Sequence, residues 1–318
     1  MAMIVRFEGN GADLIHARLL TWELTDDKGR SSDILSVSLD AESMGNIPES
    51  GREFGFYIDD EYRGKFQIAD ISEDYWPPVI NITLTSGKFT VNDPTGLKEA
   101  RTRTFKNTTF GAIVNEVMTP HGYIVKVEPD LSAKVITHAN QEQEEDDDFI
   151  SRLAERYDAI SKPVDGLYVV AKSGNRKAMS GQDIPPATIP EASIIKGKLS
   201  HPSKRVFKGV KVKWFDSETA KSGEVVIGSA PFKAVRNQYK NESDAREKAD
   251  SELYRATRKG QSLNLTVQGQ KGIFAESIIS IDNPLNERFS GDWSTDTVLL
   301  SGDKTKYSIN IQATRPRN

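Results

Sequence analysis

Apolar and polar residues alternate in several short runs along the first ninety residues of the chain. The alternating apolar positions are Leu35, Val37, Leu39, Phe54, Phe56, Ile58, Phe66, Ile68, Ile80, Ile82 and Leu84. A two-residue period is typical of half-buried strands, and Gly51, Gly64 and the pair Pro77-Pro78 stand between the runs as turn residues. Because no helical pattern separates these strands, we predict an antiparallel β-sandwich or β-barrel over residues 1–92.

A helical period replaces the alternation from about residue 93. The apolar face of the first predicted helix consists of Phe110, Ile113, Val114 and Val117. Thr108 or Thr109 can cap the start of this helix, and Pro120 and Gly122 are expected to end it.

A second helix is predicted directly after the acidic run from Glu144 to Asp148. One face carries Phe149, Ile150, Leu153 and Tyr157, and the other carries Arg152, Glu155 and Arg156. This amphipathic spacing indicates a helix packed on one side only. With the strands and prolines that follow, it predicts a small inserted α/β domain over residues 93–203.

Alternation returns in the last third of the chain, at Val210, Val212, Trp214, Val225, Ile227, Leu263, Leu265 and Val267. One helix interrupts these strands, and Asn241 can cap it. Its face of small residues, Ala245, Ala249, Leu253 and Ala256, suits a helix that lies flat on a sheet. We predict a second β-barrel with one helix over residues 204–318.

The two β regions share an internal repeat. Gly64-x-Phe66-x-Ile68 matches Gly291-x-Trp293-x-Thr295, and the next alternating strands, at Ile80 and at Tyr307, each start 16 residues after their glycine. The strand at Leu35 and the strand at Leu263 precede their glycines by 29 and 28 residues. We interpret this as a structural duplication, so that a symmetric assembly would surround its axis with twice as many barrels as chains.

Composition narrows the class of protein. At 318 residues the chain is long enough for two or three domains, and it has no apolar run of membrane-spanning length and no secretory leader. The absence of cysteine excludes disulfides and thiolate chemistry. A net charge of -4 without a dense block of Lys or Arg argues against a nucleic-acid binder.

The segment from Asp147 to Tyr157, DDFISRLAERY, resembles the phage late-control D family, whose members form baseplate hubs and the base of VgrG spikes in type VI secretion. In that family Gln, Glu and Asp precede a Phe-Leu-x-Arg-Leu-Ala helix, and here Gln141, Glu144 and Asp146 supply the lead-in while Ile150 replaces the usual Leu. The positions that carry the family motif or mark the repeat are Asp148, Phe149, Arg152, Leu153, Tyr157, Gly64, Phe66, Trp214, Gly291 and Trp293.

The resemblance implies two tube-type barrels that flank the α/β domain. It also implies a homotrimer whose six barrels stack on a six-fold tail tube and whose opposite face carries a three-fold spike. Since the chain ends at Asn318, before the further barrel and needle of a VgrG protein, we expect the spike to be a separate polypeptide. The family has no catalytic residues to carry over, so we expect neither enzymatic activity nor a cofactor.

Two groups of residues could suggest a metal site. The acidic run from Glu142 to Asp148 could ligate a hard cation, but it lacks the glycine-turned spacing of a calcium loop and lies where a helix starts, which favours helix capping and surface charge. The four histidines are scattered, and we expect His16, His121, His138 and His201 to be surface or turn residues. We therefore predict no metal.

Two aromatic residues and two arginines each allow two interpretations. Phe66 and Trp293 could stack on sugars or bases, but an aromatic after a glycine on a strand is more often core. The Arg152 and Arg156 face could bind a partner carboxylate or be solvated. No nucleophile elbow, zinc-binding helix or phosphate loop occurs in the sequence.

These observations lead to one functional hypothesis and two rivals. The chain is expected to be the structural hub of a contractile phage tail, assembled in the host cytoplasm and incorporated in the virion without membrane insertion. Its expected partners are the tail tube protein, the spike and the tape-measure protein, and DNA is expected to pass through its channel without specific binding. The rivals are a trimeric carbohydrate-binding or cell-wall-hydrolysing tail protein, and a monomeric soluble enzyme.

Overall fold

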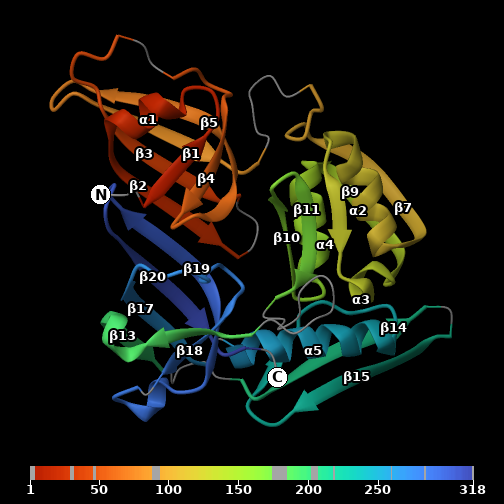
Figure 1. Cartoon of the computed structure of the whole chain (residues 1–318). Helices are drawn as coiled ribbons and strands as arrows, with labels where there is room; N and C mark the ends of the chain where they lie inside the picture. The colour runs from red at the N-terminus through yellow and green to blue at the C-terminus, as the bar shows by residue number, and fades with distance from the viewer. Residues whose placement is uncertain are drawn as a thin grey trace.

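The computed structural model describes residues 4–28, 32–45, 48–87, 94–173, 185–201, 207–217, 219–258, 260–282 and 284–316. Within these ranges, most strands belong to one curled sheet of 12 strands, drawn from both ends of the chain. Figure 1 shows its N-terminal strands in red and orange and its C-terminal strands in blue, with the yellow and green α/β insertion beside them. No described helix is both long and apolar enough to cross a membrane.

The first half of the large sheet consists of residues before position 86. Its elements are β1 (Val5–Glu8), α1 (Ala12–Arg18), β2 (Leu19–Asp27), β3 (Ile34–Asp40), β4 (Glu53–Ile58), β5 (Glu61–Asp74) and β6 (Val79–Thr85). Neighbouring strands lie in the order β1-β4-β5-β6-β3-β2. This half confirms the predicted antiparallel strands, although the sequence pattern did not reveal β1, α1 and β2.

The second half of the large sheet repeats the same order. Its elements are β12 (Ala187–Pro190), η2 (Glu191–Ser193), β13 (Ile194–Ser200), β17 (Ser262–Gln268), β18 (Ile278–Asp282), η3 (Glu287–Phe289), β19 (Asp292–Gly302) and β20 (Tyr307–Thr314). The strands lie in the order β12-β18-β19-β20-β17-β13, so each has a counterpart in the first half. One pairing differs, because β12 runs parallel to β18 whereas β1 runs antiparallel to β4.

Bulges fix the correspondence between the two halves residue by residue. The β5–β6 ladder shifts register between Ile68 and Asp70, and the β19–β20 ladder shifts between Thr295 and Thr297. The β2–β3 and β13–β17 ladders also shift at matching places. Since a bulge inserts one residue at a defined position of a ladder, its recurrence confirms the predicted duplication.

One detail of the predicted repeat is wrong. Ile80 pairs with Leu39, and Ile309 pairs with Val267, which is the counterpart of Leu39. Ile80 therefore corresponds to Ile309 and not to Tyr307. The β19–β20 hairpin has one more residue pair at its tip, Gly302 opposite Tyr307, so Ile309 lies 18 residues after Gly291 whereas Ile80 lies 16 residues after Gly64.

One continuous hydrophobic core lies on one face of the large sheet. The alternating residues of both halves contribute to it, including Phe66 and Trp293, which are buried. The glycine two residues before each aromatic has a positive φ, 127° at Gly64 and 84° at Gly291, a backbone conformation that glycine adopts most readily. The prediction that these two aromatics are core residues is confirmed.

The two halves join edge to edge through β2 and β19, which pair antiparallel from Trp22 opposite Gly302 to Asp27 opposite Thr297. The indole of Trp22 also donates a hydrogen bond to the carbonyl of Asp303, 2.9 Å away. The repeat thus makes one continuous sheet within a single chain.

The α/β insertion has its own core. It contains β7 (Arg101–Thr109), α2 (Phe110–Met118), η1 (Thr119–His121), β8 (Ile124–Val127), α3 (Pro129–Ser132), β9 (Val135–Glu144), α4 (Asp146–Glu155), β10 (Ala159–Val164) and β11 (Leu167–Lys172). The hydroxyl of Thr109 accepts a hydrogen bond from the backbone N–H of Ala112, which confirms the predicted cap of α2. Pro120 lies in the 3-10 turn that ends this helix, and Gly122 follows it.

A third, smaller unit consists of β14 (Gly209–Asp216), β15 (Lys221–Gly228), β16 (Phe232–Ala234) and α5 (Glu242–Arg258). Asn241 caps α5 by accepting a hydrogen bond from the backbone N–H of Asp244, and Ala245 and Ala249 are buried against the sheet, both as predicted. These strands pair among themselves, outside the large sheet, because the alanine face of α5 closes a separate core over them.

The segments 1–92, 93–203 and 204–318 remain a proposal for the domains. Both internal boundaries lie outside the described residues. Strand pairing crosses the second of them, since β13 pairs with β17, and the β14–β16 sheet with α5 lies outside the large sheet.

Candidate functional site

The motif helix α4 packs against β7 and β10 of the insertion. Phe149 and Leu153 are buried in its core, and the ring of Phe149 stacks on Phe105 with centroids 5.5 Å apart. Tyr157 lies just beyond the helix end, where its ring meets Phe110, and burial, followed by the charge of Glu247, raises the pKa of Tyr157 to about 12. The apolar residues of the motif therefore contribute to the hydrophobic core of the insertion.

Arg152 is occupied within the chain. Its guanidinium binds both carboxylate oxygens of Glu144, at 2.6 Å for the shortest contact, and donates to the carbonyl of Asn140. The sequence left two roles open for the arginine face, binding of a partner carboxylate or simple solvation. Arg152 has neither role, because its contacts hold β9 against α4. Arg156 is the exposed residue at the helix end.

The acidic run has a different role from the one predicted. Asp146 is fully buried, and its carboxylate accepts hydrogen bonds from the side chains of Gln141 at 2.7 Å, His121 at 2.8 Å and Arg103 at 3.0 Å. No side-chain hydrogen bond from the N-cap residue Glu145 caps the start of α4, so the predicted capping hydrogen bond is wrong, although three aspartates lie in the first turn, where the helix dipole favours negative charge. The sequence could not show that β7 and η1 bring an arginine and a histidine to this carboxylate.

The neighbours of Asp146 in the run differ in exposure. Asp147 accepts a hydrogen bond from the hydroxyl of Tyr168 at 2.8 Å, and burial raises the pKa of this aspartate. Asp148 is exposed at the helix start. Two of the six acidic residues in the run thus have buried carboxylates, and their hydrogen bonds hold the start of α4 in place.

His121 corrects a second expectation. It lies in the turn η1, as the expectation of a surface or turn residue allowed, but it is buried, since Nε2 lies 2.8 Å from Asp146 and Nδ1 lies 2.8 Å from the hydroxyl of Thr95. His16 is half-buried and accepts a hydrogen bond from the backbone N–H of Phe7. Across the described ranges, no three His, Asp or Glu side chains gather as a metal site would require.

The remaining motif residues lie in other parts of the fold. Gly64, Phe66, Gly291 and Trp293 belong to the two halves of the large sheet, and the guanidinium of Arg315 covers the Trp293 ring at 3.7 Å. Trp214 lies on β14 of the third unit, half-buried against its core. The motif positions therefore form no single cluster.

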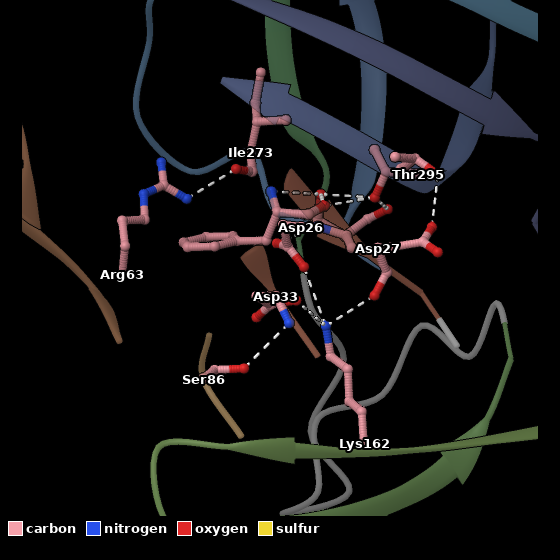
Figure 2. A network of polar contacts seen from close by, with 12 residues as sticks. Asp26, Asp27, Asp33, Arg63, Ser86, Lys162, Ile273 and Thr295 are labelled. Carbon is pink, nitrogen blue, oxygen red and sulfur yellow. Dashed lines mark hydrogen bonds and ion pairs between the residues drawn. The ribbon is translucent and has the colours of Figure 1, made fainter. Parts of the chain in front are cut away.

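A polar network that the sequence analysis missed joins the insertion to the large sheet (Figure 2). Lys162 on β10 is buried, and its Nζ donates to Asp26 at 3.1 Å, to Asp33 at 3.2 Å and to the carbonyl of Asp27 at 3.1 Å. Asp26 also accepts from the backbone N–H of Ala275, which lies in the turn before β18 of the second half. One lysine thus ties the insertion to both halves.

Charge is unbalanced in this network because one lysine faces two carboxylates. Burial, then the neighbouring Asp26, raises the pKa of Asp33 to about 7 although Lys162 opposes the rise. Burial alone would lower the pKa of Lys162, but the two carboxylates outweigh it and raise that pKa. A sequence signal did exist, since Lys162 interrupts a strand whose other residues are apolar or small.

The raised pKa predicts how stability depends on pH. Asp33 keeps its proton in the folded state up to about pH 7, whereas its ordinary pKa is 3.8, so this contribution to stability is complete below pH 3.8 and is lost as the pH rises through 7. We expect the free energy of unfolding to fall by roughly 2 kcal/mol from this group between pH 5 and 8. Urea unfolding of Asp33→Asn should show a flatter pH profile; equal slopes in the variant and the parent would contradict the assignment.

Comparison with known proteins shows which family the sequence matches. A family model described as phage tail baseplate hub (GPD) matches residues 96–305. The probable baseplate hub protein of Escherichia phage P2 is 29% identical over 213 residues, which are 65% of this chain and 54% of that protein. The chain spans about half the length of the curated relatives it matches.

Two solved structures share the fold. The 43 kDa tail protein of prophage MuSo2 from Shewanella oneidensis superposes with a TM-score of 0.72 over 98% of both chains, at 14% identity. The E. coli c3393 protein, a component of the type VI secretion system, superposes with a TM-score of 0.58 over 95% of this chain and 74% of its own, at 9% identity. At such identities the likeness concerns the fold alone.

Proposed function

The chain belongs to the phage tail baseplate hub (GPD) family, and from this premise we propose that it is the structural hub of a contractile tail, a homotrimer whose six half-barrels surround a channel. The observation that carries the proposal is the duplication: two six-stranded halves with matching bulges, joined edge to edge by β2 and β19. Three such chains would present six similar units to a six-fold tail tube and three insertions to a three-fold spike.

The face of the large sheet opposite the core supports the channel. Its polar side chains are Thr21, Glu23, Ser36, Ser38, Asn81, Thr83, Asn264, Thr266, Gln268, Ser301, Ser308, Asn310 and Gln312. All of these but Glu23 are uncharged, whereas Lys196 and Lys198 on β13, the counterparts of Thr21 and Glu23, add charge to the same face. An open hollow of about 1050 Å³ lies over part of this face, and its lining also includes Asp59, Asp303 and Lys306. A wall composed mainly of hydroxyls and amides, with charges of both signs, offers phosphates little net attraction or repulsion, which suits passage of DNA or a tape-measure protein.

Adding charge to this face tests the channel. Ser36 and Asn264 are exposed counterparts in the two halves, because each follows the leucine that marks its strand, so Ser36→Lys with Asn264→Lys would place six lysines around the proposed channel. We expect the doubly substituted protein to bind a short DNA duplex at about 50 mM salt and release it at higher salt, as measured by fluorescence anisotropy. Thr104→Lys with Thr137→Lys, both exposed in the insertion, is the matched control. Equal affinities of the two variants would contradict the channel assignment.

The mass of the assembled particle tests the proposed homotrimer. Light scattering of the purified chain, alone and co-expressed with its spike, should give three copies of the 35.3 kDa chain per particle. Peptidoglycan hydrolysis or glycan binding by the same preparation would favour the rival carbohydrate-active tail protein.

A further inference from the structure

Among the described strands of the large sheet, the outer edges of β1 and β12 are unpaired, and two further edges have no partner although their counterparts in the other half are paired. One is the outer edge of β13, which pairs only with β17. The other is the C-terminal half of β5, residues 69–74, because β4 covers only the part of β5 up to Gln67. By the repeat, β13 corresponds to β2 and β5 corresponds to β19, which are the two strands that join within the chain.

We propose that β13 of one copy pairs antiparallel with β5 of the next copy, in the register that β2 and β19 show within the chain, and that this contact closes the ring. The inference rests on the proposed homotrimer and names the surfaces that form it. Transferring the register through the matching bulges places Lys198 opposite Asp74, Ser200 opposite Ser72 and Gly197 opposite Tyr75.

Charge supports this pairing independently of the repeat. The β13 edge carries Lys196 and Lys198, both exposed, and the β5 edge carries Asp70, Glu73 and Asp74, also exposed. Lysines on a free sheet edge ordinarily prevent pairing with other chains. Here the complementary edge is acidic, so the lysines would select that edge and reject a second copy of their own.

Side-chain size supports it as well. Within the chain, the buried Trp22 lies opposite Gly302. Between copies the sizes are exchanged, with Gly197 opposite Tyr75, so the interface again places an aromatic ring against a glycine. Tyr75 is 99% exposed and the adjacent Trp76 is 84% exposed, which would leave two large aromatic side chains in water unless a neighbouring copy covers them. Two pairs in this register, Leu199 with Glu73 and His201 with Ile71, lack such complementarity.

A charge swap tests the register. Lys198→Glu places like charges opposite each other and should weaken association by about tenfold, and adding Asp74→Lys should restore it to within about threefold of the parent. Lys126→Glu, at an exposed lysine of the insertion, should have no effect on association. The dissociation constant is measured by analytical ultracentrifugation.

Cross-linking tests the geometry directly, because the chain has no cysteine of its own. Residues directly opposite each other in an antiparallel pair have Cβ atoms about 5 Å apart, so Ser72→Cys with Ser200→Cys should form disulfides that stop at a covalent trimer. Ser72→Cys with Lys196→Cys, displaced roughly 13 Å along the strand, should not cross-link.

These measurements distinguish the β13–β5 pairing from the homotrimer on which it rests. A trimer by light scattering that neither cross-links at Ser72 and Ser200 nor responds to the charge swap would overturn the β13–β5 pairing and leave the homotrimer standing. A ladder of higher covalent polymers would also overturn it, since the contact would then form an open filament rather than a ring. A monomer at every concentration would contradict the homotrimer.

Discussion

Replacing Asp146 by alanine is expected to lower the free energy of unfolding by about 3–5 kcal/mol. The carboxylate is fully buried and receives hydrogen bonds from Gln141, His121 and Arg103. Its removal would leave these donors without their acceptor, which costs more than the loss of an ordinary exposed ion pair.

Asp148 offers a matched control on the same helix. It lies in the same first turn of α4 but is exposed, so Asp148→Ala should change the free energy of unfolding by no more than about 0.5 kcal/mol. Urea unfolding followed by circular dichroism measures both variants. Equal effects of the two substitutions would show that the acidic run acts through its overall charge rather than through the buried carboxylate.

Replacing Lys162 by methionine is expected to cost about 3–5 kcal/mol at pH 8. The side chain of methionine has a similar length, but Asp26 and Asp33 would lose their shared cation while remaining buried. The loss should be smaller at pH 5, because Asp33 is already protonated there and only Asp26 loses the charge of its partner. Since β10 holds Lys162 against the large sheet, hydrogen exchange should increase at that contact.

Two further variants make the Lys162 result specific. Lys126→Met removes an exposed lysine of the same small sheet and should be nearly neutral. Adding Asp33→Asn to Lys162→Met should cost less than the sum of the two single changes, because the substitutions act on one network. Additive effects would mean that the lysine and the aspartate do not interact.

Local patterns in the sequence predicted local structure well. Thr109 and Asn241 were identified as caps because capping depends on residues within one helical turn. The alternating runs predicted β3, β4, β5, β6, β17 and β20 of the large sheet but not β1, β2 or β18, and the glycine–aromatic pairs at Gly64 and Gly291 indicated the repeat. The sequence matched Ile80 to Tyr307, two residues before its true counterpart, because spacing along the chain does not reveal that the β19–β20 hairpin has a longer tip.

These local patterns did not predict contacts between segments that are distant in the sequence. The β2–β19 junction joins residues at opposite ends of the chain, and nothing local marks either strand as a partner of the other. Burial of His121 and Asp146 likewise depends on where β7 and η1 meet α4. The assembly of Val210 and Ala245 into a separate unit was not foreseen, because alternation reports which residues are buried but not which core receives them.

The central claim is that two joined half-barrels per chain build a ring of six around a channel. Negative-stain images of the hub co-expressed with its spike test it most directly. The account predicts particles of three hub chains with a six-fold outline and a central hole when viewed along the axis. Monomeric hub particles, or trimers without a central hole, would contradict it.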